Sequence, residues 1–237
     1  MTNDLFLAQL RGFARELRGI ASDRPGTGAC TLATATLLWL WTLEHLRGSK
    51  DADGRKLYQS ARHGVTFALA DALCWLLAAR YLILDTIELE TRGRGNAALA
   101  EGLPGLVAFY TDLCHVQAAR AAGEVGRICA ELVFGYGRHP AWDAAACRAC
   151  FGVEDLDELE GFIPGITLGA RTASDVIESG EPHPAKAGPC VDLDALAPFV
   201  RLRVKLDGCL TGARLAKDRA AEALTRVAIP EALDYPA

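Results

Sequence analysis

The sequence predicts an all-α protein, an antiparallel bundle of four or more long helices with one irregular segment rich in proline and glycine. Apolar residues recur at spacings of three and four along most of the chain, as one face of a helix requires. No alternation of apolar and polar residues is long enough to seed a sheet. A chain of 237 residues can bury a large core without disulfide or metal staples, so we expect a single helical domain over residues 1–237.

The first helix is expected over residues 5–20, where apolar side chains are separated by arginine and glutamate. The apolar positions are Leu5, Leu7, Leu10, Phe13, Leu17 and Ile20. A polar stretch that contains Pro25 and Gly26 ends this helix.

The second helix, expected over residues 28–46, contains most of an uncharged run at residues 25–43. A helix of that length measures about 28 Å, close to the thickness of a bilayer core. The run is rich in threonine, alanine and glycine, and Asp71 divides the next apolar stretch, so a second uninterrupted span is missing. We therefore expect a buried helix, apolar all round because other helices surround it, and no membrane span.

Two longer helices are expected over residues 56–91 and 106–134, each ending near glycines, at 93–95 and 135–137. In the first, residues at or near helical spacing are Phe67, Ala70, Leu73, Leu77, Arg80, Leu84, Ile87 and Leu89. In the second, the residues expected to face the core are Leu106, Phe109, Leu113, Val116, Ala119, Val125, Ile128 and Leu132.

Residues 138–195 form the irregular segment, which we expect to be a surface excursion that faces a partner, because long irregular stretches are uncommon inside compact domains. A last helix is expected over residues 196–227. The residues through which it should pack are Phe199, Leu202, Leu206, Leu210, Leu215 and Leu224.

Composition argues against several classes of function. The net charge of −5 and the absence of basic patterning disfavour nucleic acid as a partner. The first residues carry no secretory signal, so the eight cysteines favour a reduced, cytoplasmic protein over a disulfide-bonded secreted one.

Cys147 and Cys150 form a single CxxC pair, for which His139, His183 and Cys190 are conceivable further zinc ligands. Two such pairs would predict zinc strongly, whereas one pair is more typical of cysteines on a short helix. We therefore predict no metal ligands, although zinc binding by this pair stays open.

Acidic residues beside the apolar helix faces suggest a carboxylate-bridged di-metal site as a second possibility. They are Asp71, Asp85, Glu88, Glu90, Glu124 and Glu131, with His115 nearby. Such a site requires a Glu-x-x-His spacing on two helices, and the nearest approach is Asp112 before His115. Pairing of these acids with Arg80, Arg120 and Arg127 is the preferred interpretation.

Two stretches together resemble the C-terminal helical domain of acyl-CoA dehydrogenases. The first comprises residues 61–67 (ARHGVTF), 69–72 (LADA) and 78–82 (AARYL). The second comprises residues 124–125 (EV) and 130–137 (AELVFGYG), similar to the family's helix that ends in a glycine turn beside the flavin. The resemblance covers roughly residues 28–150.

The resemblance implies FAD as cofactor, acyl thioesters as substrates, and Arg62, Gly135 and Gly137 as residues near the flavin. Glycine would let the backbone approach the cofactor closely. Phe134 stands where the family has the first glycine of the turn, and the family's Tyr-Glu-Gly-Thr-like segment with the catalytic base is missing. The family's N-terminal and middle domains are missing as well, so the catalytic residues stay unknown.

Two hypotheses follow. The first is an acyl-CoA-dehydrogenase-like domain or subunit that completes a flavin enzyme by pairing with a dehydrogenase subunit. The alternative is a non-catalytic helical interaction protein whose apolar helix faces form a homo-oligomer or hetero-oligomer.

Overall fold

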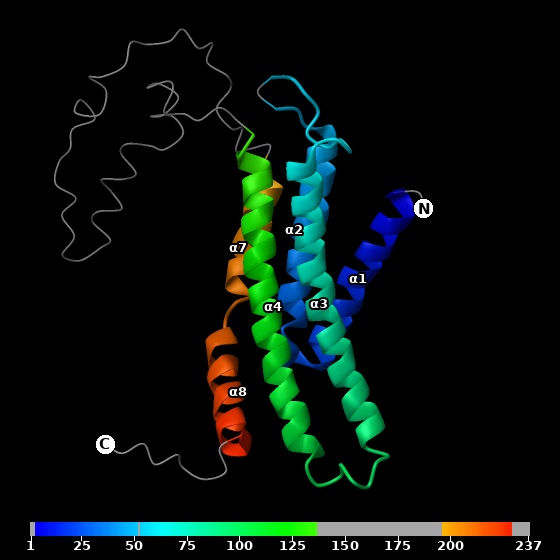
Figure 1. The fold of residues 1–237 in the computed structure, drawn as a ribbon, viewed down its shortest axis with the longest axis vertical. Coiled ribbons are helices and arrows are strands. Elements are labelled where there is room, and N and C mark those ends of the chain that lie inside the picture. Colours follow the sequence, from blue (N-terminus) through cyan, green and yellow to red (C-terminus); the bar gives the residue numbers. More distant parts are fainter. Residues whose placement is uncertain (1–2, 52, 137–195, 229–237) are drawn as a thin grey trace, which may run out of the picture. The chain divides into compact units, whose positions relative to one another are not determined.

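The structure, a computed structural model, describes residues 3–51, 53–136 and 196–228, and within these ranges it is helical without any strand (Figure 1). The only pairing of strand type there is an isolated bridge between Lys50 and Lys56. The helices are α1 (Asn3–Asp23), η1 (Pro25–Thr27), α2 (Ala29–Gly48), α3 (His63–Gly93), α4 (Leu103–Phe134), α7 (Ala197–Gly208) and α8 (Ala213–Ala228). The predicted all-helical character is confirmed for the described residues, and the irregular segment 138–195 lies outside them.

The chain turns sharply between α1 and α2 because Pro25 opens a short 3-10 helix and Gly28 adopts a left-handed conformation with φ of 72°. A Cβ at Gly28 would lie 2.8 Å from the Cβ of Ala118 and 3.0 Å from the Cα of His115. Glycine therefore allows α2 to begin directly against α4.

α2 packs against α1, α3, α4 and α7. Its buried residues are Ala29, Thr31, Leu32, Ala33, Ala35, Thr36, Leu38, Trp39, Leu40, Thr42, Leu43 and Leu46. Threonines inside this helix donate their hydroxyl hydrogens to carbonyls one turn earlier, as Thr36 does to Leu32 (2.8 Å) and Thr42 to Leu38 (2.9 Å). Most of α2 is therefore buried by its neighbours, although Cys30 and Glu44 are exposed.

α3 and α4 form an antiparallel pair joined by a short connection, with Gly93 at the end of α3 packed against Leu103 at the start of α4 (Figure 1). α3 begins later than the predicted residue 56. The preceding residues form turns instead, in which the amide of Leu57 donates to the carbonyl of Ser49 (3.0 Å) and the amide of Arg62 to that of Gln59 (3.0 Å).

The buried positions of α3 are a narrow seam. They are Val65, Leu69, Ala72, Leu76, Ala79, Ile83, Thr86 and Gly93. The residues that the sequence analysis placed at helical spacing along this segment all lie outside the seam. Both sides of α3 carry apolar residues, and α2 and α4 cover only one of them.

α4 is buried mainly in its second half. Val125, Ile128 and Leu132 are buried as predicted, but the predicted core residues of the first half are only half-buried. Those half-buried residues are Leu106, Phe109, Leu113, Val116 and Ala119.

The prediction of one helix over residues 196–227 is wrong. The chain breaks between Gly208 and Gly212, whose φ of 85° requires glycine, and continues as α8. α7 lies against α2, where the ring of Phe199 is 5.5 Å from that of Trp41, and its Leu206 lies beside Gly126 of α4. α8 lies against α4 and buries the small residues Ala216 and Ala220.

Three leucines predicted to pack in this region are exposed instead. They are Leu210, Leu215 and Leu224. α8 is held by short alanines and by Arg219, which donates to the carboxylate of Asp112 on α4, so its leucines lie on the outer side.

Candidate functional site

The residues predicted to lie near a flavin are at one end of the α3–α4 pair. Arg62 immediately precedes α3 and Gly135 immediately follows α4, and the antiparallel arrangement brings both to the same end (Figure 1). Gly137 lies outside the described residues. The flavin hypothesis requires both long segments to be helical, and their described parts contain no strand.

Local backbone geometry accounts for the glycine at 135. Its φ of −73° is an ordinary right-handed value, and its amide donates to the carbonyl of Glu131 (2.8 Å). A Cβ at this position would collide with that same carbonyl oxygen. The last turn of α4 therefore demands glycine by itself, and Gly135 forms no cradle that only a cofactor would explain.

The backbone of Arg62 supports the start of α3. Its carbonyl accepts from the amides of Val65 (3.0 Å) and Thr66 (3.1 Å). Neither Arg62 nor Gly135 lines either of the two cavities described below. Among the described residues, the flavin hypothesis therefore has Arg62 and Gly135 at one end of the helix pair, but no cavity that they line.

Several of the described acids pair with arginines. Within the described ranges no group of three or more His, Cys, Asp or Glu side chains is placed to hold a metal ion. Arg127 pairs with Glu131 (2.7 Å) and Glu124 (3.2 Å), as predicted. Glu90 pairs with Arg24 and Arg94, and the hydrogen bond from Arg24 is the main cause that lowers the pKa of Glu90.

The two other predicted arginine partners behave differently. Arg80 of α3 pairs with Glu16 of α1 (2.7 Å) and lies over the ring of Phe13 (4.6 Å), whereas Arg120 lies over the ring of Trp75 (5.2 Å). The prediction that Arg80 and Arg120 pair with the acids of the long helices is therefore wrong. Both cations lie over aromatic rings, where the ring quadrupole attracts them. The zinc candidates Cys147, Cys150, His139, His183 and Cys190 lie outside the described residues.

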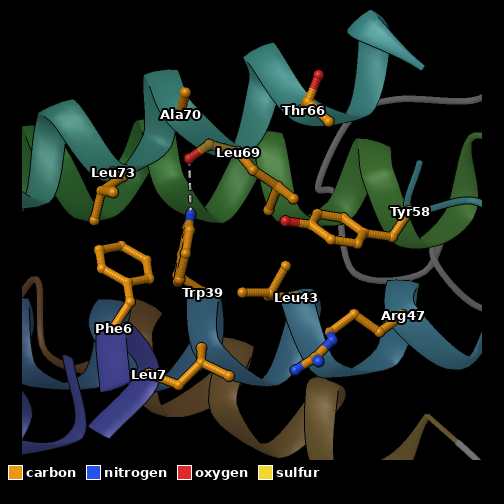
Figure 2. Close-up of a pocket in the computed structure, with 10 residues that line it drawn as sticks. All are labelled: Phe6, Leu7, Trp39, Leu43, Arg47, Tyr58, Thr66, Leu69, Ala70 and Leu73. Carbon is orange, nitrogen blue, oxygen red and sulfur yellow. Dashed lines mark hydrogen bonds between the residues drawn. The ribbon is translucent and has the colours of Figure 1, made fainter. Parts of the chain in front are cut away.

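A cavity of about 190 Å³ lies between α1, α2 and α3 (Figure 2). Its floor is Trp39 and Leu43, and the indole nitrogen of Trp39 donates to the carbonyl of Leu69 on α3 (3.0 Å). The residues that line it are Phe6, Leu7, Trp39, Leu43, Arg47, Tyr58, Thr66, Leu69, Ala70 and Leu73. A more open hollow of about 390 Å³ lies at the far end of the hairpin, beside Asp85, Glu88 and Arg92.

The cavity between α1, α2 and α3 is built to hold apolar groups. Figure 2 shows the ring of Tyr58 projecting between α2 and α3 with its hydroxyl toward Leu69. Arg47 supplies the cation at this end, but the lining contains no carboxylate, imidazole or thiol. Of the side-chain types usual in general acid–base chemistry, this lining offers the phenol of Tyr58.

The most exposed apolar surface on a long helix lies along α3, opposite its buried seam. We define the α3 face as the exposed residues His63, Phe67, Ala70, Cys74, Ala78, Tyr81 and Asp85. Phe67 is 67% exposed and Tyr81 is 56% exposed, although both are large and apolar. Ala70 belongs also to the wall of the cavity, so the face and the cavity mouth are continuous.

The helical spacing of apolar residues did not by itself reveal the α3 face. The signal was present, because residues 63–93 carry apolar residues at helical spacing on two sides rather than one. Nothing in the periodicity says which side the neighbouring helices cover.

α3 alone, among the helices of the described ranges, is both long and apolar enough to cross a membrane. This is weak evidence for a membrane span, because one side of the helix is already packed against α2 and α4.

No family model, curated protein or solved structure matches this chain. The resemblance to acyl-CoA dehydrogenases therefore stays a prediction from the sequence.

Proposed function

We propose that this chain is a helical interaction protein that docks an apolar helical partner on the α3 face. The observation that carries the proposal is the exposure of Phe67 and Tyr81 on a helix whose other side is packed. Exposed apolar patches of this kind on a rigid support are typical of protein-interaction sites, and aromatic residues dominate the energy of such interfaces.

The α3 face is held rigidly, which favours binding. The seam beneath it packs on α2 and α4, and the ion pair between Arg80 and Glu16 ties α3 to α1. The guanidinium of Arg80 also lies 5.6 Å from the centre of the Tyr81 ring. A face that is already ordered loses little conformational entropy when a partner binds.

A protein partner suits this face better than a lipid bilayer. The face includes Asp85 and is flanked by the exposed Asp71, and none of its residues is a lysine or arginine. Helices that lie on membranes combine an apolar side with basic residues that attract anionic lipids. The small residues Ala70, Cys74 and Ala78 instead permit the close approach of another helix.

The test compares two glutamate substitutions at equally exposed apolar residues. Phe67 on the α3 face and Val204 on α7 are both 67% exposed. We expect Phe67→Glu to lower the mass of the natively purified protein by light scattering, because it places a charge in the contact, whereas Val204→Glu leaves the mass unchanged. Equal masses for wild type and both variants, with equal helix content by circular dichroism, would contradict docking on this face.

A flavin-linked role as an acyl-CoA-dehydrogenase-like subunit is the second candidate. It is favoured by the position of Arg62 and Gly135 at the same end of an antiparallel helix pair, as that hypothesis requires (Figure 1). FAD would have to bind at this end of the helix pair, held jointly by this chain and by residues of a dehydrogenase subunit. The flavin would carry the redox chemistry, and the subunit would provide the base.

Titration of the full chain with FAD tests this second candidate. Binding should shift the visible absorbance of the flavin and quench its fluorescence, and Arg62→Ala should weaken it. An unchanged flavin spectrum, both alone and with acyl-CoA present, would count against a flavin site on this chain by itself.

A further inference from the structure

The α3 face has a symmetric order about its central residue. Phe67 and Tyr81 each lie seven positions from Cys74, Ala70 and Ala78 each lie four positions away, and His63 and Asp85 each lie eleven. At 3.6 residues per turn, all of these residues lie within about 40° of the direction of Cys74 around the helix axis. All seven are exposed.

We propose, resting on the docking function above, that the partner of the α3 face is a second copy of this chain, with the two α3 helices antiparallel and the twofold axis at Cys74. A twofold axis places each residue opposite the one that lies equally far on the other side of the axis. Phe67 of each copy then faces Tyr81 of the other, and Ala70 faces Ala78.

Each of these pairings is physically favourable. Two aromatic pairs lie at the outer parts of the contact, about 21 Å apart along the helix, and such pairs add to the burial of their area. Alanine against alanine on either side of Cys74 lets the helix axes approach closely where they cross.

The ends of the face are complementary in charge and hydrogen bonding. His63 of each copy comes opposite Asp85 of the other, so that an imidazole N–H can donate to a carboxylate at both ends. The ring of His63 already lies 4.9 Å from that of Phe67, which directs it along the face. A parallel pairing would instead set Asp85 against Asp85, which repels.

Cysteine cross-linking tests the register and direction directly. In a Cys74→Ser background of the full chain, Ala70→Cys and Ala78→Cys variants are prepared separately, then mixed and oxidised mildly with copper phenanthroline in air. We expect a covalent dimer between positions 70 and 78 in the mixture, identified by peptide mass spectrometry, and none between like positions in either variant alone. Like positions lie about 12 Å apart along the axis in the antiparallel pair, which is beyond the reach of a disulfide. Cross-links between like positions, or none involving positions 70 and 78, would overturn the proposal.

A charge exchange provides a second measurement that needs no new cysteine. His63→Glu and Asp85→Lys should each weaken self-association at least several-fold in sedimentation, since the first sets two carboxylates together and the second sets a lysine against the imidazole. The double variant should restore it, because the two charges attract again. Failure of the double variant to recover would overturn this register.

These outcomes separate this inference from the proposed function. If Phe67→Glu disrupts a complex that contains a different protein, and wild type shows no self-association, the docking function stands and the second copy is wrong. If wild type binds phosphatidylcholine vesicles through this face and stays monomeric in solution, both are wrong. If the dimer mass survives Phe67→Glu, both are wrong.

Discussion

α2 and α3 are both long, apolar helices, yet they occupy different environments. α2 packs against four other helices and buries most of its circumference, whereas α3 buries one seam and exposes Phe67 and Tyr81 on the opposite side. The difference shows that an apolar composition predicts that a helix will bury apolar surface, but not which side of the helix is buried or by what. Helices of the same chain pack around most of α2. On α3, no helix of the described residues packs against the side that carries Phe67 and Tyr81.

The largest expected effect is a difference in the free energy of unfolding between substitutions in α2 and in α3. Leu38 of α2 is fully buried, so Leu38→Ala should lower the free energy of unfolding by about 2–5 kcal/mol through lost burial and a new cavity. Leu77 lies half-buried on the outer flank of α3, and Leu77→Ala should cost less than half as much. Urea denaturation followed by circular dichroism gives both values. Equal losses would show that α3 is covered as completely as α2.

Thiol reactivity separates the faces at the level of single residues. Burial raises the pKa of Cys129 on α4 to about 11, whereas Cys74 lies exposed on the α3 face. Because the thiolate is the reactive form, maleimide at neutral pH should modify Cys74 at least about a hundred times faster than Cys129. Peptide-resolved mass spectrometry measures both rates in one sample.

Protein concentration sharpens this measurement. If α3 pairs with a second copy, modification of Cys74 should slow as the protein concentration rises, while modification of the exposed Cys30 on α2 should not. Rapid modification of Cys129 in the native protein would contradict the buried position of α4.

The contact between the two helices is expected to have a smaller effect. Trp39→Phe removes the hydrogen bond from the indole to the carbonyl of Leu69 and should lower the free energy of unfolding by about 1 kcal/mol. Tryptophan is larger than phenylalanine, so the cavity beside α1 should also widen. Unchanged stability by urea denaturation would mean that water replaces this bond without loss.

The smallest effect concerns pH and the far end of α3. The pKa of Glu90 is lowered below its usual value of 4.5, chiefly by its hydrogen bond from Arg24. The ion pair therefore contributes stability above that pH, and the contribution is lost as the pH falls through the lowered pKa of the folded state. Glu90→Gln should remove this contribution to the loss of stability in acid. For a partly exposed pair, the change in the free energy of unfolding should be less than about 1 kcal/mol. Denaturation midpoints at a series of pH values below 5 measure it. An identical pH dependence in wild type and variant would contradict the pairing.

The sequence by itself determined where most helices lie. Residues 5–20, 28–46 and 106–134 were predicted close to α1, α2 and α4, because helical periodicity is a local property and glycines and prolines punctuate it. The sequence-based prediction was wrong near Gly212, where the single helix predicted over residues 196–227 is two helices, α7 and α8. The glycine signal there was present, but glycine alone does not say whether a helix passes through or stops.

Only the tertiary structure decided which side of each helix is covered. On α3 both sides are apolar, so the choice between the seam at Leu76 and the face at Cys74 depends on where α2 and α4 come to lie. The same holds for α8, where Ala216 packs and Leu215 does not. Burial depends on contacts between residues far apart in the chain, and a periodic pattern encodes only neighbours three and four positions away.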